Sequence, residues 1–141
     1  MLNGDFIKKA FLEIEKYLKI LQKRKGINGE KLKQDTELLL MVAHALQFTI
    51  QALTDIGTHI LSEIGSERWE DYADIPRYLS MSKIISEKNA EIFVSMVKMR
   101  NILAHEYISL DAEKVADVIN NRLDDIMTIV LEYKNYFEKH K

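Results

Sequence analysis

The stretch from residue 36 to residue 64 restricts the fold of this chain more than any other feature. Its apolar residues recur at helical spacing but spread over more than half of a helix circumference. They are Leu38, Leu39, Met41, Val42, Ala45, Leu46, Phe48, Ile50, Ala52, Leu53, Ile56, Ile60, Leu61 and Ile64. A helix this apolar must be covered on two sides, by its own bundle and by a partner. We predict a central helix that begins between Glu30 and Thr36 and ends at Glu63 or Ile64, before Gly65.

Three other segments have the one-sided apolar pattern of helices packed on a core. They cover residues 6–21, residues 89–104 with a short piece at 82–86 before them, and residues 112–137, with Asp111 as the N-cap. Residues 65–79, with Trp69, Tyr72 and Pro76, are expected to form a packed acidic loop. No strand alternation or internal repeat is present. The pattern predicts one all-α domain over residues 1–141, an up-and-down bundle of four to five helices.

Composition agrees with a helical, soluble protein. Five Gly and one Pro in 141 residues are too few for a turn-rich β-sandwich. The absence of cysteine excludes disulfides, zinc–cysteine sites and thiol catalysis. No apolar run reaches the roughly 18 residues of a membrane span, and Lys8, Lys9, Glu13 and Glu15 interrupt the first apolar segment. We therefore expect a cytoplasmic protein without signal peptide or membrane segment.

Reactive side chains are concentrated between Arg100 and Tyr107, where four residues separate Arg100 from His105. A nuclease that works without a metal needs a group that moves the proton of the ribose 2′-hydroxyl. It also needs a cation that stabilises charge on the phosphorane. Histidine suits the first task because its unperturbed pKa is about 6.5, and the arginine fork suits the second. The segment predicts Arg100 and His105 as catalytic residues, with no metal and no cofactor.

The spacing of Arg100 and His105 creates a geometric problem. On a straight helix, with about 100° per residue, the two side chains point about 140° apart, whereas Arg100 and Tyr107 lie within about 20° of one face. Arg100 and His105 of one helix cannot converge on one phosphate. Either the helix ends near Ala104 and turns His105 back, or a second subunit supplies the partner group across a two-fold axis.

The segment and the predicted bundle resemble the HEPN superfamily and, within it, the HepT toxins. The motif of those toxins is Arg, four residues that often begin with Asn, then His, any residue, and Tyr. Arg100, Asn101, His105 and Tyr107 match this motif without a gap. Residues 55–60, Asp-Ile-Gly-Thr-His-Ile, resemble the end of the second helix in that family.

The resemblance implies the toxin of a toxin–antitoxin pair that cleaves RNA as a homodimer, with the motifs lining a shared cleft. It also implies a partner, a minimal nucleotidyltransferase (MNT) that neutralises the toxin by transferring AMP to Tyr107. Phosphates on a phenol beside the catalytic pair would fill the cleft with negative charge. Asn101 belongs to the motif, and Asp55 and His59 are expected to border the cleft and support Arg100.

Two other functions remain open from the residues alone. The chain could be a non-catalytic module that binds a nucleotide or a nucleotidyltransferase, since the same side chains can hold a phosphate without cleaving it. It could also be a structural helical dimer, in which the grouping of Arg100, His105 and Tyr107 is accidental. Asp55 and His59 have a simpler interpretation as polar residues at the edge of the bundle.

Overall fold

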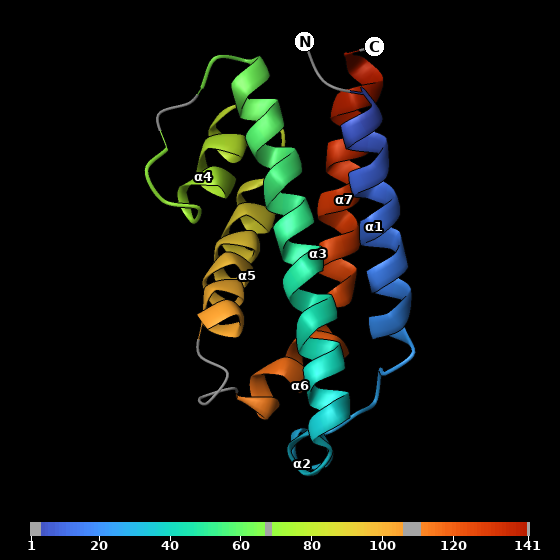
Figure 1. The fold of residues 1–141 in the computed structure, drawn as a ribbon. Helices are drawn as coiled ribbons and strands as arrows, with labels where there is room; N and C mark the ends of the chain where they lie inside the picture. Colours follow the sequence, from blue (N-terminus) through green and yellow to red (C-terminus); the bar gives the residue numbers. More distant parts are fainter. Residues whose placement is uncertain (1–3, 67–68, 106–110, 141) are drawn as a thin grey trace.

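The computed structural model describes residues 4–66, 69–105 and 111–140, and this part of the chain is all-α (Figure 1). Its helices are α1 (Gly4–Gln22), α2 (Gly29–Gln34), α3 (Thr36–Glu63), α4 (Asp74–Met81), α5 (Glu87–His105), α6 (Ala112–Asn121) and α7 (Leu123–Lys139). The long helices α1, α3, α5 and α7 are the four that the apolar pattern predicted. The all-α bundle is therefore confirmed.

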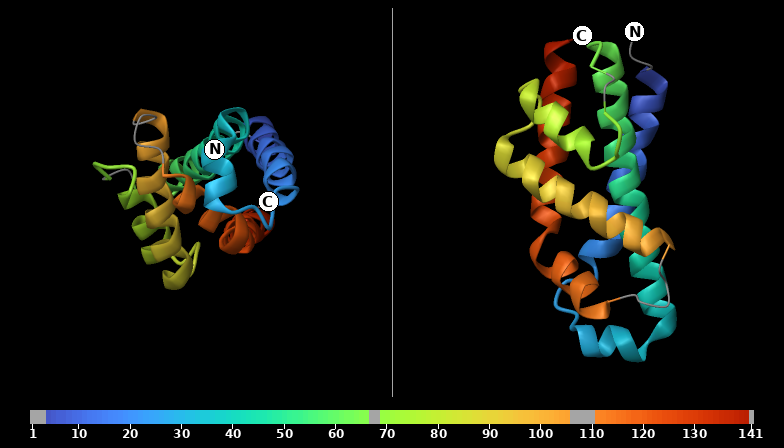
Figure 2. Two further views of the ribbon diagram at one scale, coloured as in Figure 1. Left: turned by 90° about the horizontal axis from the view of Figure 1, so that it is seen from below. Right: turned by 90° about the vertical axis from the view of Figure 1, so that its left-hand side faces the viewer.

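The central helix of the bundle is α3, as its wide apolar surface predicted. Seen from below, α4 and α5 lie on one side of α3, and α1 and α7 lie on the other (Figure 2). Its N-cap is Asp35, whose side chain accepts the Leu38 N–H, and its end lies just before Gly65. Gly65 has a φ of +77° there, a conformation that glycine adopts without strain.

Most of the apolar residues of α3 pack within the bundle. By length and hydropathy alone this helix would pass as a membrane span, but half of its most apolar window is buried inside the protein. Exposed large apolar side chains form a stripe with His44 in its N-terminal half. This α3 stripe consists of Leu40, Met41, His44 and Phe48.

The short elements depart from the prediction. The helix α2 was not predicted as a separate element, and residues 82–86, predicted as a short helical piece, form a turn. Residues 65–79 are not only a loop, because α4 begins at Asp74, and Pro76 is tolerated in its first turn, where backbone N–H groups have no intrahelical acceptor. The segment predicted as one helix over 112–137 is divided into α6 and α7 at Arg122. Its N-cap is Asp111, as predicted, and accepts the Glu113 and Lys114 N–H groups.

Gly57 allows two helices, α4 and α7, to approach α3 closely. A Cβ at this position would lie 2.8 Å from Tyr133 Oη on α7 and 2.9 Å from Leu79 Cδ1 on α4. The Tyr133 hydroxyl donates to the Leu53 carbonyl at 2.8 Å. Burial raises the pKa of Tyr133 well above its usual value, and the nearby Glu132 raises it further, so the hydroxyl stays protonated and keeps this bond.

Candidate active site

The predicted motif lies at the end of α5, a helix that is anchored at its other end. Ser86 Oγ accepts the Asn89 N–H at 3.1 Å and caps the first turn. Glu132, on α7, accepts the Ser86 N–H at 2.8 Å and the side-chain amide of Asn89. From this junction α5 crosses α3 obliquely and in the opposite sense, so that its last turns lie beside the N-terminal half of α3 (Figures 1 and 2).

The backbone of α5 is helical from Glu87 through His105. The chain therefore does not turn back at Ala104, which was one of the two ways to bring His105 toward Arg100. On this continuous helix the two residues remain about 140° apart around the axis. Of the motif, Arg100 and Asn101 are described with their side chains and His105 by its backbone, whereas Tyr107 lies outside the described residues.

The Arg100 guanidinium is held without a carboxylate partner among the described residues. Its Nη1 donates to Asn101 Oδ1 at 2.9 Å. The ring of Tyr72, in the loop before α4, lies 5.7 Å from Arg100 Cζ. Arg100 Nε is buried, and no acceptor in the described part of the chain pairs with it. Such an unpaired donor is costly, and an oxygen from a ligand or a second subunit would lower that cost.

Asp55 and His59 lie on α3, and their described partners do not include Arg100. Asp55 Oδ1 accepts the side-chain amide of Gln51 at 2.8 Å. The His59 ring stacks on Phe6 of α1, with 4.1 Å between ring centroids, so it faces α1 rather than α5. No hydrogen bond or ion pair joins either residue to Arg100 within the described residues.

A groove of about 720 Å³ separates α5 from α6 and has mainly apolar walls, which include Met96, Met99 and Val115. Arg100 is not among its lining residues. The cation instead faces the loop before α4, on the other side of α5. Within the described ranges, no three His, Asp or Glu residues are grouped as metal ligands would be.

The contact between Tyr72 and Arg100 is a part of the site that sequence reasoning missed. Residues 65–79 were expected to form a packed acidic loop, and no contact of Tyr72 with the motif was predicted. Tyr72 and Arg100 are 28 residues apart, so no local pattern could relate them. Only the position of the loop against α5 brings the ring to the cation.

Comparison with known proteins identifies the same family that the sequence resembles. A model of the family described as "Ribonuclease HepT-like" matches residues 14–132. The tRNA nuclease HepT of Aphanizomenon flos-aquae is 28% identical over 125 residues, which are 87% of this chain and 84% of that protein. The mRNA nuclease HepT of Shewanella oneidensis is 28% identical over 122 residues, covering 86% of this chain and 91% of that protein.

Solved structures share the fold over nearly the whole chain. A toxin–antitoxin complex with AMP-PNP has a TM-score of 0.85 at 26% identity and covers 94% of this chain and 99% of that one. The tri-AMPylated HEPN toxin of Shewanella oneidensis, in complex with its MNT antitoxin, has a TM-score of 0.84 at the same identity and the same coverage. The family match spans most of the sequence and includes Arg100, Asn101, His105 and Tyr107. The chain belongs to the HepT-like ribonuclease family.

Proposed function

We propose that this chain is the toxin of a toxin–antitoxin pair and cleaves RNA without a metal ion. Arg100 stabilises the charge that develops on the scissile phosphate, and His105 moves the proton of the 2′-hydroxyl. The observation that carries this proposal is the state of Arg100, whose guanidinium has no carboxylate partner among the described residues and keeps one buried donor unpaired. Its charge is therefore available to a phosphate.

The proposed active form is a two-fold dimer. Because α5 continues to His105, Arg100 and His105 of one subunit do not point toward the same phosphate. A second copy of the chain supplies the missing group. The α3 stripe offers an apolar surface for this second copy. Antiparallel pairing of two α3 helices would place the C-terminal half of one, with Asp55 and His59, near the end of α5 in the other. Asp55 and His59 then support the partner's arginine across the interface.

The proposed partner is a minimal nucleotidyltransferase that modifies Tyr107. The HEPN toxin of Shewanella oneidensis, which is 26% identical to this chain, is tri-AMPylated and in complex with an MNT antitoxin. We assign the acceptor to Tyr107, the motif tyrosine two residues after His105. Added phosphates would compete with RNA for Arg100. We place both proteins in the cytoplasm, where the RNA substrates of such a toxin are found.

The test is incubation of RNA with the pure protein in the presence of EDTA. We expect cleavage by the wild type and a loss on the order of 10²–10³ in rate for Arg100→Ala, with a loss of about 10²–10⁴ for His105→Ala. Lys134→Ala is the control, because this lysine of α7 pairs with Glu15 of α1 at 3.1 Å, on the side of α3 opposite α5. It should cleave like the wild type.

Three results would contradict the proposal. Cleavage that stops on metal chelation would show that the chemistry needs a metal. Full activity in Arg100→Ala or His105→Ala, at equal solubility and equal thermal stability, would remove that residue from the mechanism. RNA or nucleotide binding without any cleavage would favour a non-catalytic module associated with the nucleotidyltransferase.

A further inference from the structure

Arg100 contacts one end of an aromatic ladder, which consists of the rings of Tyr72 and Trp69. It does not contact an acid, although the loop before α4 is rich in carboxylates. The Tyr72 ring lies 5.7 Å from Arg100 Cζ, within the range in which an aromatic face attracts a guanidinium. Trp69 stacks on Tyr72, with 5.8 Å between ring centroids and 27° between ring planes. Trp69 is partly buried and packs against the core. The ladder therefore connects the motif arginine to the interior of the protein.

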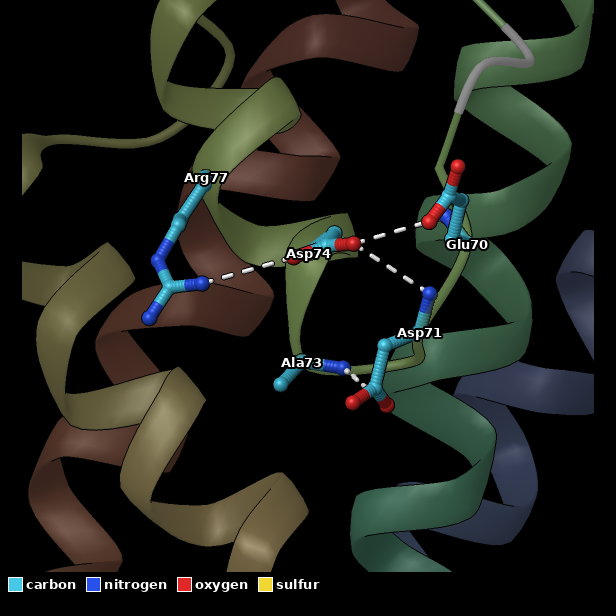
Figure 3. Close-up of polar contacts among 5 residues, drawn as sticks. All are labelled: Glu70, Asp71, Ala73, Asp74 and Arg77. Atoms are coloured by element: carbon cyan, nitrogen blue, oxygen red, sulfur yellow. Dashed lines mark hydrogen bonds and ion pairs between the residues drawn. The ribbon is translucent and has the colours of Figure 1, made fainter.

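The acidic side chains of this loop hold its own backbone (Figure 3). Asp74 Oδ2 accepts the Asp71 N–H at 3.2 Å, and Asp74 Oδ1 pairs with Arg77 Nη1 at 3.4 Å. Asp71 Oδ1 in turn accepts the Ala73 N–H at 3.3 Å. These bonds fix the backbone on both sides of Tyr72. The acids shape the turn, and the aromatic ring is what the turn presents to the arginine.

An aromatic ring suits a phosphate-binding arginine better than a carboxylate would. A carboxylate would pair with the N–H edge of the guanidinium, cancel its charge and compete with the phosphate. A ring attracts the cation through its face and leaves the N–H donors free. Asn101 engages one of these donors at Nη1. Together the ring and the amide restrict the guanidinium while its net charge remains.

We propose that Tyr72, supported by Trp69, is a positioning residue that holds the Arg100 guanidinium in the orientation for phosphate binding. The proposal rests on the function proposed above, because it acts through Arg100. Tyr72 itself does not touch the reacting atoms. Its effect is expected in kcat, since a guanidinium that must be reoriented in each turnover stabilises the transition state less well. The KM for RNA should change little.

The experiment compares two substitutions at a half-exposed position, since 43% of Tyr72 is accessible to solvent. Tyr72→Leu removes the ring and should lower kcat on the order of tenfold, with KM within about twofold. Tyr72→Phe keeps the ring and should restore kcat to about the wild-type value. Equal kcat in the wild type and Tyr72→Leu overturns the proposal. An equal loss in both variants also overturns it, because the hydroxyl and not the ring would then be responsible.

A double-mutant cycle separates positioning from general damage. In an Arg100→Lys background there is no planar guanidinium for the ring to orient, so Tyr72→Leu should have almost no further effect on kcat. Phe11→Leu is the matched control, because the Phe11 ring lies 5.5 Å from the Lys134 ammonium on the α1–α7 side of α3. It should leave kcat unchanged. Additive losses in the cycle, or a comparable loss in the control, contradict the proposal.

A readout without catalysis keeps the two proposals distinguishable. The side-chain Nε–Hε signal of Arg100, assigned by its absence in Arg100→Lys, should carry a ring-current shift that disappears in Tyr72→Leu and persists in Tyr72→Phe. If this signal does not move in Tyr72→Leu, the ladder does not hold the guanidinium and the inference fails. If the wild type cleaves no RNA, the proposed function fails, while the shift still shows whether the ladder holds Arg100.

Discussion

At the scale of single residues, the motif could be predicted from the sequence and its surroundings could not. Arg100, Asn101, His105 and Tyr107 are close in the chain, and their chemistry and spacing point to one segment. The contact of Arg100 with Tyr72 depends on the path of a loop 28 residues away. Asp55 and His59 were placed correctly on the second long helix, but the residues they contact in the described chain are Gln51 and Phe6.

The role of Tyr107 can be tested separately from that of Arg100. We expect Tyr107→Phe to keep most of its RNA cleavage, because a phenol with a pKa of about 10 is a poor proton shuttle at neutral pH. The same variant should escape neutralisation by the nucleotidyltransferase, since it has no acceptor oxygen. Growth of cells expressing both proteins, with mass spectrometry of the toxin for added AMP, measures both effects.

Two outcomes would revise this division of roles. An inactive Tyr107→Phe toxin would assign the hydroxyl to catalysis. A toxic variant that the antitoxin still neutralises would show that the antitoxin acts by covering the cleft. The matched control is Tyr136→Phe, which removes a hydroxyl from a partly buried tyrosine on α7 and should change neither toxicity nor neutralisation.

At the scale of elements, the spacing of the apolar residues predicted which segments form helices. The breaks between helices depend instead on tertiary contacts. The apolar stripe runs through residues 112–137 without interruption, yet the helix breaks at Arg122. Next to this break, Asn120 accepts the Gly26 N–H at 2.6 Å and donates to the Ile27 carbonyl at 2.7 Å. Such bonds to a distant loop leave no periodic signal. The first turn of α4 was hidden because proline and acids are also typical of loops.

The close packing around Gly57 predicts a destabilised Gly57→Ala variant. Inside a helix this change usually stabilises by about 0.5–1 kcal/mol, but here the new Cβ would lie 2.8 Å from Tyr133 Oη and 2.9 Å from Leu79 Cδ1. Overpacking of this kind costs about 1–3 kcal/mol, so we expect a net loss in the free energy of unfolding. Urea unfolding followed by circular dichroism measures it.

Two further variants make this prediction specific. Gly4→Ala is the control, because nothing lies within 4 Å of a Cβ at that position, and it should be neutral or slightly stabilising. In a Tyr133→Phe background the nearest oxygen is gone, so Gly57→Ala should cost less than it does in the wild type. Equal stability of Gly57→Ala and Gly4→Ala would show that α4 and α7 move away from α3 without penalty.

At the scale of the whole molecule, the sequence predicted that α3 has a wide apolar surface. It did not predict which part of that surface stays exposed. The sequence indicated a helix covered on two sides, and Figure 2 places helices on both sides of α3. Which residues stay exposed depends on how α1 and α5 pack, and only the structure identifies the α3 stripe. Phe48 is 42% exposed and Met41 is 39% exposed. Their half of α3 lies at the same end of the bundle as the last turns of α5.

Substitution in this stripe should separate subunits and abolish toxicity together. Phe48→Glu puts a charge into the proposed interface, so light scattering should report a monomer and RNA cleavage should be lost. Leu131→Glu is the control, since Leu131 is 59% exposed on α7, away from the motif, and should remain a fully active dimer. A Phe48→Glu protein that is monomeric and active would show that one subunit suffices. A dimer in both variants would place the interface elsewhere.

The junction of Ser86, Asn89 and Glu132 has a mechanical consequence for the motif. It restrains α5 at its first turn, and the 19 residues of the helix put its last turn about 27 Å away. Beside that far end, the groove between α5 and α6 leaves one flank of the helix without a packed neighbour. A rotation of about 5° at the junction would displace the motif by about 2 Å over this lever arm. Since a shift of roughly 1 Å can reduce a rate a hundredfold, we expect turnover to depend on the Glu132 carboxylate, although it holds the opposite end of α5 from the motif.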